Sequence, residues 1–316
     1  MNILVYGAGA IGSAIGGFLA SGGHKVSFLG RLWHMDRINE TGLFITGIWG
    51  DHLVEDIDTY TEFTQIPSES NFDLILITVK SYDTERAGKE VKDLIKDNTL
   101  VIHLQNGLGN AEKLLDYIPE DKLITGRVIF GVEIEPGVVK VTVSADEIVL
   151  GTVGSVPAPT IKEVSDIFSR AGLPARLSTR IDKHLWAKAL YNCALNPLAT
   201  ILEVPYGFLA ENEFTTEIMD KVIEEIYHVG GEMSVEFDHP TQEEYKELFY
   251  SQLVPATAEH HASMLQDIKR GKSTEIDALN GAISAYGERY GVDTPYNSLL
   301  TNLIKAKEIK SRSKQT

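Results

Sequence analysis

The apolar positions follow two different patterns along the chain. In the first half, short apolar runs rich in Ile, Leu and Val alternate with stretches whose apolar residues recur at helical spacing. Such runs are typical of strands buried on both faces, and their alternation with helices predicts βαβ units and a parallel sheet. The predicted strands are residues 3–6, 26–29, 74–79 and 100–104, and the predicted helices lie near 10–22, 82–96 and 107–117.

Segments 43–56 and 123–151 carry strand-like runs interrupted by Gly and Pro, and we expect them to add antiparallel strands at the edge of the main sheet. After about residue 179 strand signals end and helical spacing dominates. The predicted helices there are 181–196, 213–234, 241–251, 259–269, 274–291 and 296–311, the first ending at Asn196-Pro197.

These patterns predict an α/β fold class. An N-terminal Rossmann-like, doubly wound parallel sheet with edge additions is followed by an all-helical C-terminal domain. The predicted boundaries are 1–178 for the Rossmann-like domain and 179–316 for the helical domain. A length of 316 residues suits two domains.

The charge narrows the choice of partners. The chain has 29 Lys and Arg against 45 Asp and Glu, a formal net charge of −16. Such a field repels phosphate backbones, so we expect no nucleic acid partner. Any anionic ligand must be met by a few locally placed cations.

The sequence lacks features of secreted and membrane proteins, and this absence indicates the cellular compartment. Cys193 is the single cysteine, which excludes an intrachain disulfide and fits a reducing compartment. No apolar run approaches the roughly 20 residues needed to cross a bilayer. The start, MNILVYGAGAIG, has no basic segment and is interpreted as a strand rather than a signal peptide. We therefore expect a cytoplasmic protein without a membrane partner.

A glycine-rich turn follows the first strand directly and opens a helical pattern; it consists of Gly7, Ala8, Gly9, Ala10, Ile11 and Gly12. In a GxGxxG turn the first glycine permits the tight turn, the second lets the backbone approach a pyrophosphate, and the third lets helix and strand pack closely. The phosphates then lie at the helix N-terminus, where amide hydrogens and the helix dipole favour negative charge. This context predicts dinucleotide binding, although a plain glycine-rich turn has the same letters.

Arg31 ends the second strand, 19 positions after Gly12. An NAD site usually places Asp or Glu near this point to bind the ribose 2′-hydroxyl. A guanidinium instead suits a 2′-phosphate, and a hydrogen bond to a charged group contributes about 10- to 100-fold in affinity. We therefore expect NADP(H) rather than NAD(H). A solvated Arg at a helix start is the alternative, and Asp36 is close enough in sequence to keep NAD(H) open.

Lys188, Asn192 and Asn196 are spaced i, i+4, i+8 and form a row on one predicted helix face. A cation and two amides are costly in a core unless they line a polar cleft. An exposed polar stripe is the alternative, but the apolar neighbours Trp186 and Leu190 disfavour full exposure. The spacing favours a cleft.

Further motifs follow in order along the chain; they are Thr78-Val79-Lys80, Gln105-Asn106-Gly107-Leu108-Gly109, the segment from Trp186 to Leu198, Ser263-Met264-Leu265-Gln266-Asp267, Thr274-Glu275-Ile276-Asp277 and Asn280-Gly281. With the GxGxxG turn and Arg31, this ordered set resembles the ketopantoate reductase (2-dehydropantoate 2-reductase) family. The resemblance spans residue 3 to about residue 281.

The resemblance implies an NADP-dependent oxidoreductase. Its reaction is the reduction of 2-dehydropantoate to pantoate by hydride transfer to the C2 ketone, as in pantothenate biosynthesis and the coenzyme A pathway. It implies Lys188 as general acid and Glu275 as the group that orients it. Cofactor contacts fall to residues 7–12, Arg31, Lys80 and Asn106, and substrate contacts to Asn106, Asn192, Asn196 and Ser263.

Two positions depart from the family pattern, because Tyr206 and His260 stand where family members commonly carry Asn. Both are bulkier but still form hydrogen bonds, so we count them as substrate-binding candidates. They motivate an alternative, a reductase of another 2-oxo acid on the same fold. A non-catalytic NADP(H)-binding sensor is a third reading, and the pair Lys188 and Glu275 argues against it.

The sequence Glu259-His260-His261 invites a metal interpretation. Adjacent residues of a helix point about 100° apart and do not converge on one ion, so we expect no metal site. The expected partner is a small-molecule 2-oxo acid, and the resemblance leaves a homodimer open.

Overall fold

The computed structural model describes residues 1–313; residues 314–316, at the end of the predicted helical domain, lie outside it. The chain divides into two compact units. The first comprises residues 1–105 and 110–181, and the second comprises 106–109 and the chain from Asp182 onward. The expected boundary at 178/179 lies three residues before this division, and the segment 106–109 joins the helical unit although it follows a strand of the first.

The first unit contains an eight-stranded sheet in the order β12-β11-β8-β7-β6-β1-β2-β5. Its strands are β1 (Asn2–Tyr6), β2 (Lys25–Leu29), β5 (Ile57–Tyr60), β6 (Leu74–Ile77), β7 (Leu100–His103), β8 (Leu123–Arg127), β11 (Ile148–Gly151) and β12 (Ala175–Leu177). All neighbours pair in parallel except β11, which is antiparallel to β8. The chain runs outward from β1 to β5 and then from β6 in the other direction, so the doubly wound prediction is confirmed.

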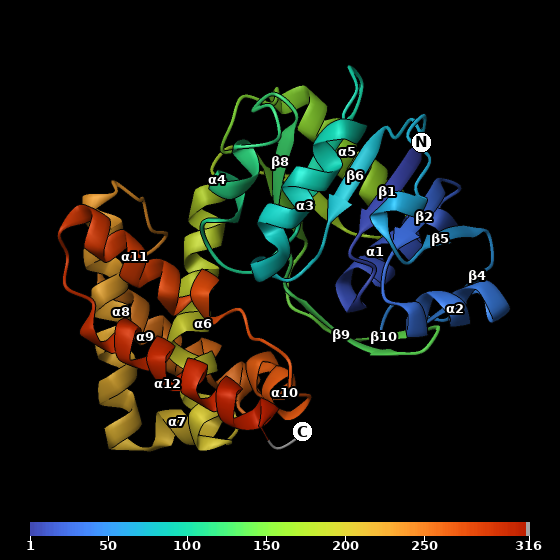
Figure 1. Ribbon diagram of the computed structural model, residues 1–316. Coiled ribbons are helices and arrows are strands. Elements are labelled where there is room, and N and C mark those ends of the chain that lie inside the picture. The colour runs from blue at the N-terminus through green and yellow to red at the C-terminus, as the bar shows by residue number, and fades with distance from the viewer. Residues whose placement is uncertain (314–316) are drawn as a thin grey trace. The chain divides into compact units, whose positions relative to one another are not determined.

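Helices cover both faces of this sheet (Figure 1). They are α1 (Ala10–Ser21), α2 (Leu32–Thr41), α3 (Thr84–Val91), α4 (Asn110–Leu115) and α5 (Ala158–Arg170), with short 3-10 turns η1 (Phe63–Gln65), η2 (Ser81–Asp83) and η3 (Lys92–Leu94). In β1, Ile3 and Val5 pack into one core with α1 and α5, whereas Leu4 and Tyr6 pack into another with α3 and α4. Burial on both faces explains the continuous apolar runs.

The strands expected in segments 43–56 and 123–151 were predicted to lie at the edge of the main sheet, and only some of them belong to that sheet. β3 (Leu43–Gly47), β4 (His52–Val54), β9 (Phe130–Glu135) and β10 (Val138–Ser144) form a separate four-stranded sheet in the order β4-β3-β10-β9. Its inner face buries Leu43, Ile45, Val139 and Val141 in the core that contains α1. The expectation of edge additions was therefore wrong for these strands, because one apolar face per strand suits packing on a helix. β8 is also a parallel member of the main sheet, and the antiparallel additions at its edge are β11 and β12, which run parallel to each other and opposite to β8.

The helical unit is built around α6 (Ile181–Leu202), most of which lies in this unit. The other helices are α7 (Tyr206–Glu211), α8 (Glu213–Glu232), α9 (Gln242–Leu248), α10 (Ser263–Lys269), α11 (Asn280–Tyr290) and α12 (Pro295–Arg312), with the π-helical turn η4 (Phe249–Leu253) and the 3-10 turns η5 (Pro255–Thr257) and η6 (Ile276–Ala278). One apolar core joins α6, α8, α11 and α12. The buried Glu225 carboxylate of α8 accepts the backbone N–H groups of Tyr296 (2.8 Å) and Asn297 (2.9 Å), which caps the N-terminus of α12.

Two boundaries in this unit differ from the prediction. Pro197 lies inside α6, so the expected end at Asn196-Pro197 was wrong. Proline removes the amide that would bond the carbonyl of Cys193, and the Asn280 side chain supplies a donor there instead. The helix predicted from 274 begins at Asn280, which leaves Glu275 in the turn before it.

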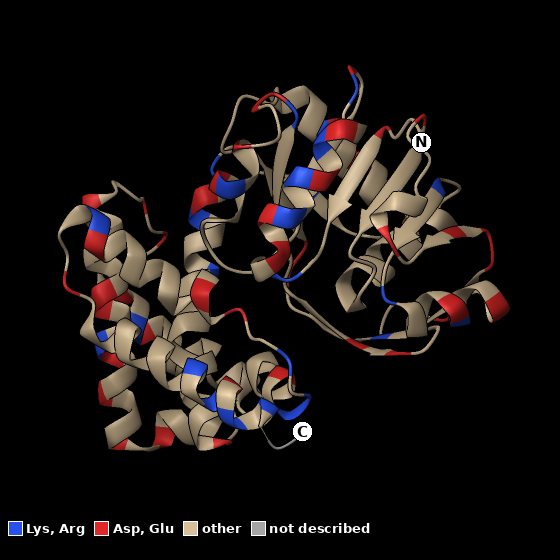
Figure 2. Ribbon diagram, viewed as in Figure 1, with Lys and Arg blue, Asp and Glu red and all other residues tan. Residues whose placement is uncertain are grey.

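Acidic side chains are spread over the helices of both units, whereas Lys and Arg gather at the end of α12 (Figure 2). Two of those lysines form ion pairs, Lys305 with Asp277 at 2.5 Å and Lys307 with Glu203 at 2.8 Å. These two lysines are therefore already paired with carboxylates of the same unit. No helix among residues 1–313 is both long and apolar enough to cross a bilayer.

Candidate functional site

The glycine-rich turn lies at the carboxyl end of β1, beside the end of β6. Gly7 has a φ of +104°, and the amides of Gly7 and Ala8 both donate to the carbonyl of Leu29, at 3.0 and 2.8 Å. A Cβ on Gly12 would lie 2.4 Å from Oγ1 of Thr78. That hydroxyl donates to the Gly7 carbonyl at 2.8 Å. Internal packing thus accounts for the first and third glycines.

Gly9 is different, because nothing inside the protein requires a glycine there. Its φ is −90°, and a Cβ would meet only the Gly7 carbonyl oxygen, at an ordinary 3.8 Å. The first bond of α1 joins the Ser13 amide to the Gly9 carbonyl (2.8 Å), so the amides of residues 10–12 have no acceptor within the helix. An exposed bare backbone beside free amides is a surface that fits a pyrophosphate.

Arg31 and Lys80 follow the ends of two strands at this same edge of the sheet. Arg31 is the N-cap of α2, is exposed, and forms no ion pair or side-chain hydrogen bond with any described residue. Lys80 is half-buried and precedes η2. In the first unit the structure therefore brings together the turn, Arg31 and Lys80 at the carboxyl edge where doubly wound sheets bind ligands.

The segment 106–109 is anchored within the helical unit. The amide of Leu108 donates to the carbonyl of Ala278 at 2.7 Å. Gly107 has a φ of +90°, and a Cβ there would lie 2.3 Å from the same carbonyl oxygen, so only glycine fits. This close approach holds Asn106 beside the turn that carries Glu275.

Asn106 joins the two residues implied as catalytic. The Lys188 ammonium donates to Oδ1 of Asn106 at 2.5 Å, and Nδ2 of Asn106 donates to Oε2 of Glu275 at 3.4 Å. Lys188 and Asn106 are half-buried, and Glu275 is 8% exposed. The arrangement presents an ammonium group, fixed on one side by an amide that is itself held by a carboxylate.

The other members of the polar row lie on α6 as predicted. The helix is continuous from Ile181 to Leu202, so Lys188, Asn192 and Asn196 share one face. Asn192 is half-buried and Asn196 is buried. The hydroxyl of Tyr206 donates to Oδ1 of Asn196, so the second amide is held at its oxygen and keeps its N–H groups available.

The two departures from the family pattern lie next to one another. The Tyr206 amide donates to the His260 carbonyl at 3.1 Å, and the two rings are 5.2 Å apart. Burial raises the pKa of the Tyr206 phenol, so it stays a donor at neutral pH. Partial burial lowers the pKa of His260, and the charge of His261 adds to the effect. Ser263 follows as the exposed first residue of α10.

Sequence reasoning missed two residues beside this cluster. The hydroxyl groups of Tyr191 and Thr257 lie 2.5 Å apart, and the ring of Tyr191 is 5.9 Å from that of Tyr206. Tyr191 follows Lys188 by three positions, so its place on the polar row could have drawn attention to it. Thr257 has no sequence signal, because η5 reaches the cluster only through the fold.

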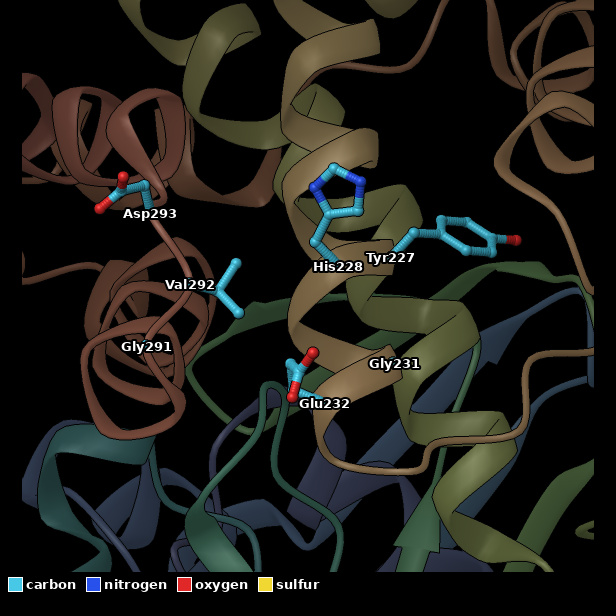
Figure 3. Close-up of a pocket in the computed structure, with 7 residues that line it drawn as sticks. All are labelled: Tyr227, His228, Gly231, Glu232, Gly291, Val292 and Asp293. Atoms are coloured by element: carbon cyan, nitrogen blue, oxygen red, sulfur yellow. The ribbon is translucent and has the colours of Figure 1, made fainter.

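Two further features are the segment around His260 and a surface pocket. The segment 259–261 is a loop before α10 rather than a helix, and among residues 1–313 no group of three or more His, Cys, Asp or Glu side chains could hold a metal. A surface pocket of about 570 Å³ lies between α8 and the loop after α11 (Figure 3). It is lined by Tyr227, His228, Gly231, Glu232, Gly291, Val292 and Asp293, none of which is a predicted site residue.

Comparison with known proteins identifies the family of both units. Residues 3–155 match the family model described as ketopantoate reductase PanE/ApbA, and residues 180–308 match its C-terminal counterpart. A 2-dehydropantoate 2-reductase of Aquifex aeolicus is 44% identical over 311 residues, which cover 98% of this chain and 97% of the relative.

Solved structures agree over the full length. A PanE/ApbA family ketopantoate reductase from Ralstonia eutropha superposes with a TM-score of 0.88 at 32% identity, covering 99% of this chain and all of the other. D-mandelate dehydrogenase, solved with NADH and anilino(oxo)acetate, superposes with a TM-score of 0.88 at 31% identity, covering 98% and 99% of the two chains. The predicted resemblance is thus confirmed, and this chain belongs to the ketopantoate reductase PanE/ApbA family.

Proposed function

We propose that this protein catalyses the NADPH-dependent reduction of 2-dehydropantoate to pantoate, a step of pantothenate and coenzyme A biosynthesis. The observation that carries the proposal is the chain of hydrogen bonds from Lys188 through Asn106 to Glu275. A non-catalytic NADP(H)-binding sensor would not need this series of hydrogen bonds. The full-length relative from Aquifex aeolicus, named as a 2-dehydropantoate 2-reductase, supports the same reaction.

The cofactor contacts are assigned within the first unit. The free amides of residues 10–12 and the bare backbone of Gly9 would hold the pyrophosphate, and Arg31 the 2′-phosphate of the adenosine. Lys80 and Asn106 are further cofactor contacts implied by the family. NADPH, when bound, supplies the hydride. Arg31 favours NADP(H) here, although a solved relative binds NADH.

The helical unit supplies the proton and the substrate contacts. The Lys188 ammonium donates a proton to the ketone oxygen as negative charge develops there, which completes the alcohol. Asn106 and Glu275 keep that ammonium oriented. Asn192, Asn196 and Ser263 would donate hydrogen bonds to the substrate carboxylate and hydroxyl groups, and Asn106 is a further substrate contact that the family implies.

The second candidate is a reductase of another 2-oxo acid. The contact between Tyr206 and His260 motivates it, whereas the relatives named as 2-dehydropantoate 2-reductases do not favour it. Two bulky rings occupy positions where the family commonly carries two amides. Because they alter substrate contacts and leave Lys188 and Glu275 untouched, they change the choice of acid and not the reaction.

The test is NADPH oxidation with a panel of aliphatic and aromatic 2-oxo acids. We expect 2-dehydropantoate to give the highest kcat/KM, and Lys188→Ala to lower it at least ~100-fold. Lys183→Ala is the matched control, because Lys183 lies on the same helix but pairs with Glu236 at 3.5 Å. Turnover of a different acid alone would select the second candidate, and tight NADPH binding without any turnover would leave only a sensor.

The cofactor preference has its own test. Arg31→Ala should weaken NADPH binding about 10- to 100-fold and NADH binding much less, since only NADPH carries the 2′-phosphate. Arg37→Ala is the control on the same helix, where the guanidinium already pairs with Glu40 at 3.0 Å. Equal losses for both cofactors would contradict the assignment.

The proposal includes a cytoplasmic location and a homodimer. Cys193 is the single cysteine of the chain and is buried, so the fold contains no intrachain disulfide that would need an oxidising compartment. Phe208 and Phe214 at the α7–α8 corner are 45% and 70% exposed, which suits a surface covered by a second copy. Light scattering after size exclusion measures the mass, and Phe214→Glu should yield a monomer.

A further inference from the structure

We infer that His34 is a positioning residue for cofactor selection: its ring holds the pyrophosphate turn and the helix start that carries Arg31 at a fixed separation. The inference rests on the proposed use of NADP(H). It concerns a residue that contacts neither phosphate and that no sequence motif singled out.

His34 lies in the first turn of α2, and its side chain is completely buried. Nε2 of the ring is 3.0 Å from Oγ of Ser13 on α1. Nδ1 accepts the backbone N–H of Gly137 at 3.1 Å, in the turn between β9 and β10. One imidazole therefore bonds to two elements that are far from it in sequence.

The charge state of the ring fits both bonds. Burial lowers the pKa of His34 to about 4, so the ring is neutral near pH 7. Because Nδ1 accepts a hydrogen bond from Gly137, the ring proton resides on Nε2, which then donates to the Ser13 hydroxyl. Both ring nitrogens are satisfied, and the ring has a single preferred orientation.

Each end of this connection is adjacent to a phosphate-binding group. Ser13 directly follows Gly12, and its amide closes the first turn of α1 on the Gly9 carbonyl at 2.8 Å. The amide of His34 donates to the carbonyl of Arg31 at 3.0 Å. The Arg31 guanidinium has no partner among the described residues, so its backbone alone fixes where it starts. The amides of Gly7 and Ala8 already bond the Leu29 carbonyl, two residues before Arg31. The His34 ring adds a link from α1 to the helix start that carries Arg31, and so helps to set the distance between the pyrophosphate amides and Arg31.

That distance matters to one cofactor more than to the other. NADPH would be held at the pyrophosphate and at the 2′-phosphate together, and the gain from two linked contacts depends on their spacing. NADH has no 2′-phosphate and uses only the first of these contacts. Loss of the connection should therefore weaken NADPH binding selectively, whereas general destabilisation would affect both cofactors alike.

The experiment measures the Kd of NADPH and of NADH by fluorescence titration, together with Tm, for four variants of the full chain. Ser13→Ala and His34→Asn remove the bond between α1 and α2, since the Asn oxygen reaches only the position of Nδ1. His34→Gln keeps a donor near the position of Nε2, and His34→Phe removes both bonds. Ser165→Ala is the matched control, because that buried hydroxyl bonds only within its own helix, to the Ile161 carbonyl at 2.9 Å.

We expect Ser13→Ala, His34→Asn and His34→Phe to raise the Kd of NADPH about five- to tenfold and that of NADH less than about twofold. His34→Gln should retain most of the preference, and Ser165→Ala all of it. Equal changes for the two cofactors in Ser13→Ala, or none, would overturn the inference even if His34→Phe failed to fold.

Arg31→Ala, measured in parallel, separates this inference from the function on which it rests. If Arg31→Ala also leaves the ratio of the two Kd values unchanged, the assignment of NADP(H) itself fails. If Arg31→Ala lowers the preference for NADPH while Ser13→Ala and His34→Asn do not, only the role of His34 fails.

Discussion

The side-chain amide of Asn280 donates a hydrogen bond of 3.0 Å to the backbone carbonyl of Cys193. In an α-helix that carbonyl would be bonded by the amide four residues later, but this position is Pro197. Asn280 thus replaces the amide that proline lacks, and α6 continues for five more residues to Leu202. Because Asn196 lies just before the proline, the same bond supports the end of the polar row.

We predict that Asn280→Ala lowers the free energy of unfolding by about 1–3 kcal/mol, since it leaves a buried carbonyl without a donor. Pro197→Ala in that background should restore about 1 kcal/mol by returning the backbone amide. Urea unfolding of both single variants and the double variant measures the coupling. Strictly additive effects would show that Asn280 and Pro197 do not act on one carbonyl. Recovery should be incomplete, because Asn280 also donates to Oδ1 of Asn297 at 3.0 Å.

A second prediction concerns the charge of Glu275. Glu275→Gln keeps an acceptor for Nδ2 of Asn106 but removes the negative charge, whereas Glu275→Ala removes both. We expect kcat to fall about tenfold in the first and about 100-fold in the second, since orientation of Lys188 contributes separately from charge. Steady-state kinetics with saturating NADPH measure both. Identical losses would mean that the hydrogen bond through Asn106 has no effect of its own.

A third prediction concerns the hydroxyl of Tyr206. Tyr206→Phe frees Oδ1 of Asn196, whose amide can then turn. We expect the KM for the 2-oxo acid to rise about three- to tenfold with kcat nearly unchanged, because the hydroxyl contacts a substrate-binding amide and not the proton donor. Glu211→Ala, at an exposed position on the same helix, is the control. A large fall in kcat with constant KM would contradict this role.

The pH dependence of stability follows from two buried histidines. Burial lowers the pKa of both His34 and His103 to about 4, against 6.5 in the unfolded chain. Well above pH 6.5 both are neutral in the folded and in the unfolded state. As pH falls toward 4 the unfolded chain binds protons that the folded protein does not, so stability decreases, by about 3 kcal/mol for each group.

Urea unfolding between about pH 8 and pH 4.5 measures this decrease. In the double variant His103→Leu and Thr125→Val, which replaces both partners of a 3.1 Å hydrogen bond by apolar groups, the histidine part of the slope should halve. An unchanged slope would mean that His103 is not protonated on unfolding in this range.

The local pattern of apolar residues was sufficient to predict many of the strands and helices. Strands buried on both faces, such as β1, are recognisable because they carry a continuous apolar run, here residues 3–6. β3, β4, β9 and β10 were recognised as strands but assigned to the wrong sheet, since pairing partners such as Phe44 and Val138 lie far apart in the sequence. β5 and β12 were missed, because strands as short and mixed as Ala175–Leu177 are defined by their neighbours.

The sequence by itself determined what depends on neighbouring positions in the chain. The glycine turn and the row of Lys188, Asn192 and Asn196 follow from local geometry, because a turn and a helix fix the spacing of their own residues. The net charge of −16 also comes from the sequence alone, and it showed that anionic ligands must be bound by a few locally placed cations.

Only the tertiary structure decided contacts between segments distant in the chain. It joined Asn106 to Lys188 and Glu275, paired Tyr206 with His260, and placed His34 between Ser13 and Gly137. The physical reason is that a hydrogen bond depends on positions to within a few tenths of an ångström. Packing of whole elements sets such positions, and no spacing along the chain encodes them.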